Sequence, residues 1–89
     1  MKKIAIIGAG DAGERFINTI LSSNLKNSYT ITAIFDDDLG KINSTIHGFK
    51  IIDSTENLNN YTDLFDTIII AIPSSSEKEL PHSLLIVFT

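Results

Sequence analysis

Cysteine is absent from this 89-residue chain, and proline occurs only twice. The lack of cysteine excludes disulfide bonds, thiolate catalysis and cysteine-ligated zinc. The two histidines, His47 and His82, do not have the spacing of metal ligands. We therefore expect no metal site.

Long apolar runs are also missing. No stretch approaches the ~20 apolar residues that a membrane-spanning helix requires. The apolar segment after the first lysines runs only from Ile4 to Ile7, which is too short for the hydrophobic part of a secretory signal. We expect a soluble, cytoplasmic protein with no membrane segment.

Basic residues are few and scattered. The chain has seven Lys and Arg residues and eleven Asp and Glu residues, which gives a formal net charge of −4. A nucleic-acid surface needs clustered cations to neutralise phosphates, so we expect no nucleic-acid partner. The length predicts a single domain over residues 1–89.

The informative feature lies at the start of the chain. Lys2 to Ile7 reads as a short apolar strand and runs directly into the motif G-x-G-x-x-G. In the dinucleotide-binding fingerprint, the first glycine permits a tight turn, the second lets a pyrophosphate approach the backbone, and the third lets the helix pack closely. The three glycines of the motif are Gly8, Gly10 and Gly13, and the pyrophosphate would lie on the free backbone N–H groups at the start of the helix.

An acidic cluster follows about 20 residues further on, as the fingerprint requires. Thr30 to Phe35 reads as the second strand and ends at Asp36, Asp37 and Asp38. A carboxylate at Asp36 would accept hydrogen bonds from ribose hydroxyls and repel a 2′-phosphate, so it favours NAD over NADP. The alternative is that these aspartates are solvated turn residues.

The other elements follow from periodicity. Apolar residues at helical spacing predict a helix from Asp11 to Asn24, whereas no helical period is seen from Leu39 to Gly48, so the usual second crossover helix is missing or reduced. Phe49 to Ile52 reads as a third strand. A helix then begins at Asp53 or Ser54 and buries one face. We expect that face to consist of Leu58, Tyr61, Leu64 and Phe65.

The carboxyl-terminal third contains two further strands. Thr67 to Ile72 is a continuous apolar run, as expected of a central strand. Ser74 opens a helix that must stop by Leu80, because Pro81 lacks a backbone donor. Leu84 to Phe88 then reads as a fifth strand, parallel to the fourth. The predicted fold is a Rossmann-like parallel α/β sheet in the order 3-2-1-4-5, with helices on both faces.

Catalytic motifs are not present. The Tyr-x-x-x-Lys pair of short-chain dehydrogenases is lacking, because Tyr29 and Tyr61 are followed four residues later by Ala33 and Phe65. His47, next to Gly48, reads as a turn residue rather than a general base. We expect the isolated chain to bind a ligand without catalysing a reaction.

Four motifs together resemble one family. Gly8 to Gly13, Ala33 to Asp38, Ile46 to Ile52 and Ile69 to Ser74 resemble the nucleotide-binding domain that precedes the catalytic domain in nucleoside-diphosphate-sugar dehydratases and epimerases of bacterial polysaccharide biosynthesis. The resemblance implies that a nucleotide contacts three segments. These are the glycine loop at Gly8, Gly10, Asp11, Ala12 and Gly13, the strand end at Asp36 and Asp37, and the turn formed by Ala71, Ile72, Pro73 and Ser74.

Two alternatives remain open. The chain is also similar to the amino-terminal domain of sugar acyltransferases, which implies a UDP-sugar instead of NAD. The other alternative is an assembly module in which the glycine loop is only structural. At the carboxyl end, the family pattern leads us to expect a truncated or altered sequence after about residue 80, and a homo-oligomer formed through residues 84–88.

Overall fold

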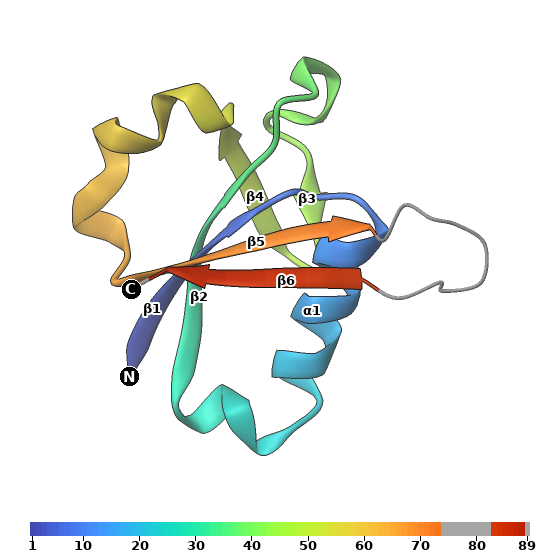
Figure 1. Cartoon of the computed structure of the whole chain (residues 1–89), viewed down its shortest axis with the longest axis vertical. Helices are drawn as coiled ribbons and strands as arrows, with labels where there is room; N and C mark the ends of the chain where they lie inside the picture. The colour runs from blue at the N-terminus through green and yellow to red at the C-terminus, as the bar shows by residue number, and fades with distance from the viewer. Residues whose placement is uncertain (74–82, 89) are drawn as a thin grey trace.

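The amino-terminal strand lies in the middle of a six-stranded sheet. We describe residues 1–73 and 83–88 of a computed structural model of the chain (Figure 1). The inner strands run parallel, and the strand at each edge is antiparallel to its neighbour. Across the sheet, the strands are β3 (Thr45–Ile46), β4 (Phe49–Asp53), β2 (Tyr29–Phe35), β1 (Lys2–Ile7), β5 (Thr67–Pro73) and β6 (Ser83–Phe88).

This arrangement confirms the predicted α/β fold and the order 3-2-1-4-5, with β3 as an additional edge strand. The direction of the last strand was predicted incorrectly, because β6 runs antiparallel to β5, with Ser83 opposite Pro73. Only residues 74–82 separate the two strands, fewer than the dozen or more that a parallel crossover needs. The helix predicted from Ser74 lies outside the described residues.

One helix covers the first face of the sheet. Helix α1 (Asp11–Leu21) buries Ile17 and Ile20 against Ile4 and Ile6 of β1. The apolar residues of α1 recur at helical spacing, so they share the face that meets the strands. The helix ends at Leu21, with Ser22 as its C-cap, and a short 3₁₀ helix, η1 (Asn24–Asn27), leads into β2.

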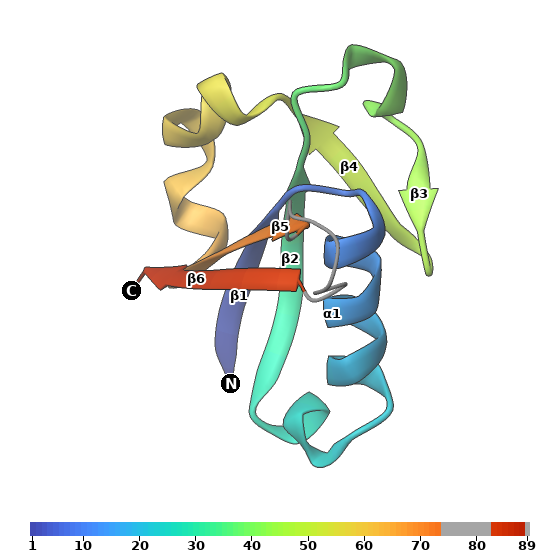
Figure 2. The same ribbon diagram turned by 45° about the vertical axis from the view of Figure 1, so that its right-hand side comes forward.

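The opposite face packs against η3 (Thr55–Leu64). Figure 2 shows this yellow-to-orange segment on the other side of the central strands from α1. Small side chains at Ala5 and Ala33 leave room there for Phe35, whose ring meets those of Tyr61 and Phe65 edge-on at 5.6 and 6.3 Å. Such edge-to-face pairs are favourable aromatic contacts.

The predicted helix after β4 is present as this 3₁₀ helix, with Ser54 as its N-cap. Its backbone is non-helical at Tyr61, so the segment is kinked there. Leu58, Tyr61 and Phe65 pack on the sheet as predicted. The prediction for Leu64 was wrong: 41% of its surface is exposed, because the kink breaks the helical period that the prediction assumed.

The second crossover helix is indeed reduced. Only η2 (Leu39–Lys41) forms after β2, and the chain then makes a hairpin from β3 and β4. His47 and Gly48 form the hairpin turn, with φ of 51° and 87°. Two consecutive positive φ values are typical of the two-residue turns that join the strands of a β-hairpin. The interpretation of His47 as a turn residue is therefore confirmed.

At the carboxyl end, β6 completes this chain's own sheet beside β5 and forms its edge. A homo-oligomer through residues 84–88 stays a prediction. None of the helices in the described part of the chain is long and apolar enough to span a membrane.

Candidate functional site

The glycine loop connects the end of β1 to the start of α1, and two of its glycines are required by the fold itself. Gly8 has φ of 106°, and a Cβ there would lie 2.5 Å from the carbonyl oxygen of Ala71. A Cβ at Gly13 would overlap the carbonyl oxygen of Gly8. Both positions therefore need glycine for the close packing of β1, α1 and β5, whether or not a ligand binds.

Gly10 differs from these two glycines. Its φ is −87° and its ψ is −156°, a conformation open to any L-residue. Apart from Gly10 itself and its two chain neighbours, no residue of the described chain would come within 4 Å of a Cβ at this position. The packing of the described residues therefore gives no reason for glycine here, and they leave open space beside the backbone.

Gly10 is also the N-cap of α1, and it provides no side chain to cap the helix. The first-turn N–H groups of a helix bind anions well when no side chain accepts from them. Asp11 is exposed, whereas Ala12 and Gly13 are buried, so Ala12 would present only its backbone to a ligand.

The first turn of α1 also contacts the hairpin. His47 Nε2 lies 3.3 Å from Glu14 Oε2, which joins the β3–β4 turn to the helix. No local sequence pattern relates these two residues, so the contact was not predicted.

Asp36 connects the end of β2 to the glycine loop. Its Oδ2 accepts a hydrogen bond of 2.6 Å from the backbone N–H of Ala9, and its Oδ1 accepts one of 2.8 Å from Asp38 N–H. Nearby, Gly8 N–H donates to the carbonyl oxygen of Phe35. Strand β2 therefore holds the loop through both its backbone and its first following side chain.

Asp37 joins the ends of two strands. Its Oδ1 accepts a 3.0 Å hydrogen bond from the backbone N–H of Thr55, which follows β4. The next aspartate, Asp38, accepts from Gly40 N–H and caps η2, so it is a turn residue.

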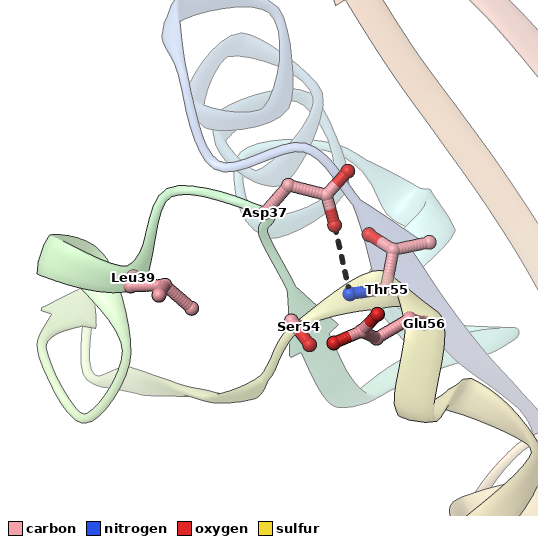
Figure 3. Close-up of a pocket in the computed structure, with 5 residues that line it drawn as sticks. All are labelled: Asp37, Leu39, Ser54, Thr55 and Glu56. Atoms are coloured by element: carbon pink, nitrogen blue, oxygen red, sulfur yellow. Dashed lines mark hydrogen bonds between the residues drawn. The ribbon is translucent and has the colours of Figure 1, made fainter.

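A cavity of about 500 Å³ opens beside Asp37 (Figure 3). We call it the β2–β4 pocket, because its walls come from the segments that follow these two strands. The pocket is lined by Asp37, Leu39, Ser54, Thr55 and Glu56.

A second carboxylate holds the wall of this pocket in place. Asp53, the last residue of β4, accepts hydrogen bonds from Ser54 N–H at 2.7 Å, Asn57 Nδ2 at 2.8 Å and Tyr61 OH at 2.7 Å. The bond from Asn57, followed by those from Tyr61 and Ser54, lowers the pKa of Asp53 below its ordinary value. The bond to Asp53 in turn raises the pKa of Tyr61. The β4–η3 junction is thereby fixed at three points.

The third predicted segment lies at the end of β5. Ala71 is buried, and its carbonyl faces Gly8. Ile72 and Pro73 end the strand, and Ser74 lies outside the described residues. The structure thus brings the backbone of β5 to the glycine loop, as expected at the carboxyl ends of adjacent parallel strands.

Four residues of the pocket were not among the predicted site residues: Leu39, Ser54, Thr55 and Glu56. Their position in the sequence could have indicated them, because they follow the ends of predicted strands and ligands of open α/β sheets bind outside the carboxyl ends of the strands. The segment after the third predicted strand begins at Asp53, and it was interpreted only as a helix start.

A family model described as "C2185-like, N-terminal" matches residues 1–87. No curated protein matches the sequence significantly.

Solved structures have the same fold. The Rex-family repressor RSP is 23% identical with a TM-score of 0.71, and RSP in complex with β-NADH is 23% identical with a TM-score of 0.68. UDP-D-quinovosamine 4-dehydrogenase from Vibrio fischeri is 30% identical with a TM-score of 0.68. Each match covers 84% of this chain, but only 35%, 36% and 60% of RSP, its NADH complex and the dehydrogenase, respectively. The chain therefore spans only part of each of these proteins.

Proposed function

The chain belongs to the C2185-like, N-terminal family, and we propose that it is a domain that binds an NAD-type dinucleotide. The observation that carries the proposal is Gly10. Gly8 and Gly13 are explained by packing inside the protein, whereas the described residues leave open space where a side chain of residue 10 would lie. In the dinucleotide-binding motif, that space is occupied by the pyrophosphate.

The adenosine ribose and the base of the dinucleotide can be placed beside the proposed pyrophosphate site. With the pyrophosphate at the start of α1, the adenosine ribose falls near Asp36 and the base falls in the β2–β4 pocket. The Asp36 carboxylate already accepts two backbone hydrogen bonds. A carboxylate has about four lone-pair sites, so Asp36 retains capacity for a ribose hydroxyl.

Charge favours NAD over NADP. Asp36, Asp37 and Glu56 all lie at or beside the pocket, and a 2′-phosphate would bring further negative charge against them. Like charges at short range disfavour binding. We expect NADP to bind at least about tenfold more weakly than NAD. Such a ratio requires that the repulsion cost only about 1.4 kcal/mol of binding free energy.

What two of the similar solved proteins bind or act on supports this proposal. RSP has been solved with β-NADH, and the Vibrio fischeri protein is a nucleotide-sugar dehydrogenase. Together with the resemblance to nucleoside-diphosphate-sugar dehydratases and epimerases, the likeness to the Vibrio fischeri enzyme supports a role of the domain in nucleotide-sugar metabolism. In this proposal the domain binds the cofactor, and the residues that transform a sugar lie outside it.

Calorimetric titration of the chain with NAD, NADP, coenzyme A and UDP-N-acetylglucosamine tests the proposal. We expect binding of NAD and weak or no binding of the others. If only the UDP-sugar binds, the chain is a nucleotide-sugar domain instead. If none binds at millimolar concentration to the folded protein, the nucleotide proposal fails and the assembly module is favoured. Turnover of the UDP-sugar by the chain alone would refute the non-catalytic role.

A further inference from the structure

The β2–β4 pocket combines an apolar surface with unused hydrogen-bonding groups. Leu39 lines it and has 74% of its surface exposed, although it is a large apolar side chain. A flat ring lying against Leu39 would remove that apolar surface from water, which is favourable. The pocket therefore suits a planar, partly apolar group such as a nucleobase.

The polar groups of the pocket differ in how far the protein itself uses them. Thr55 N–H is already bonded to Asp37. Ser54 is only 6% exposed, and its hydroxyl oxygen has a single long contact of 3.5 Å from Asn57 Nδ2. The Ser54 hydroxyl hydrogen thus remains available as a donor to a ligand.

Glu56 provides the complementary acceptor. In Figure 3 its side chain extends from the start of η3 toward Ser54. No residue of the described chain donates a hydrogen bond to the Glu56 carboxylate or forms an ion pair with it, whereas Asp37 on the facing segment is tied to Thr55. Glu56 is therefore the pocket carboxylate whose two oxygens are both available to a bound ligand.

We propose that Glu56 determines base specificity by accepting a hydrogen bond from the exocyclic amine of the nucleobase, with the Ser54 hydroxyl donating to a ring nitrogen. This inference rests on the proposed function, in which the ligand is an NAD-type dinucleotide and the base is adenine. Adenine presents an amine beside ring-nitrogen acceptors, which matches a carboxylate and a hydroxyl. Uracil presents carbonyl oxygens on both sides of its N–H, and a carboxylate would repel them.

A change confined to one edge of the base tests this role. In nicotinamide hypoxanthine dinucleotide, the 6-amine of adenine is replaced by a carbonyl oxygen and the neighbouring ring nitrogen N1 carries a hydrogen, whereas the rest of the molecule matches NAD. We expect the chain to bind NAD about tenfold more tightly than this analogue, because the change removes a hydrogen bond to a charged group. In Glu56→Gln the preference should fall to about twofold, since an amide can either accept or donate.

Asp63→Asn is the matched control. Asp63 is an exposed acid on the same element, η3, but outside the pocket, so this variant should keep the full preference for NAD. Equal affinity of the wild-type chain for both dinucleotides would overturn the inference while the proposed function stands. A preference that persists in Glu56→Gln would also overturn it. Failure of both dinucleotides to bind the folded wild-type chain would refute the proposed function itself.

Discussion

The carboxylate of Asp36 accepts a 2.6 Å hydrogen bond from the backbone N–H of Ala9, 27 residues earlier in the chain. Its other oxygen accepts from Asp38 N–H. The acidic residue at the end of β2 therefore supports the glycine loop directly, through a hydrogen bond to its backbone. This bond links the two halves of the fingerprint that the sequence shows separately.

Asp36→Asn should destabilise the protein although it preserves size. The amide has only one oxygen, so one of the two N–H donors would face an NH₂ group and lose its acceptor. An unsatisfied donor costs about 1–3 kcal/mol, which urea unfolding would measure. Asp63→Asn, on the exposed side of η3, should change stability by less than about 0.5 kcal/mol. Equal effects of the two variants would contradict the structural role of Asp36.

Sequence reasoning predicted the parts of this fold that depend on short-range patterns. The strand order, the reduced second crossover and the turn at His47 follow from runs of apolar residues and from glycine positions. The antiparallel direction of β6 was missed because strand residues look alike in either direction. Chain length between the strands would have indicated it.

The residues of the glycine motif and Asp36 were predicted as part of the site, whereas most residues that line the pocket were not. The glycines and Asp36 carry a fixed spacing, so they can be recognised in the sequence. Ser54, Leu39 and Glu56 come together only because β2 and β4 are neighbours in the sheet. Helical period likewise gave no sign of the kink at Tyr61, whose hydroxyl donates to Asp53, eight residues earlier.

Gly13→Ala should be strongly destabilising. A methyl group there would overlap the carbonyl oxygen of Gly8, a backbone atom that cannot rotate away. We expect a loss of about 3 kcal/mol from forcing the loop and α1 apart, measured by urea unfolding. Alanine is otherwise favoured over glycine inside a helix by about 1 kcal/mol, so an unchanged or increased stability would show that the loop and helix are not packed as described.

The contact between Tyr61 and Asp53 predicts a pH-dependent stability. The pKa of Asp53 is lowered in the folded state, so its contribution is present above its unfolded pKa of about 3.9 and is lost as the pH falls through the folded value. Tyr61→Phe removes one cause of that shift. The stability gap between wild type and Tyr61→Phe should therefore be larger at pH 6 than at pH 2.5.

Tyr29→Phe is the control for this pair, because the Tyr29 hydroxyl bonds to no residue in the part of the chain that the structure covers. Its effect on stability should be small and should not change over the same pH range. A gap for Tyr61→Phe that stays constant with pH would show that the hydroxyl does not stabilise the ionised Asp53.

Leu39→Ser should separate binding from folding. The side chain is 74% exposed, so its loss should change the free energy of unfolding by less than about 0.5 kcal/mol. If the base of the dinucleotide packs on Leu39, affinity for NAD should fall about three- to tenfold from the lost apolar contact. Titration calorimetry measures this, and the prediction fails if affinity is unchanged.

The most direct test of the central claim is the titration of Gly10→Ala with NAD beside the wild-type chain. The fold leaves space for this methyl group, so unfolding by urea should differ by no more than about 1 kcal/mol, the scale of an N-cap change. The account predicts that the wild-type chain binds NAD and that Gly10→Ala, equally folded, binds it at least about a hundredfold more weakly. Equal affinity of the two proteins would contradict the claim that a pyrophosphate occupies the space beside Gly10.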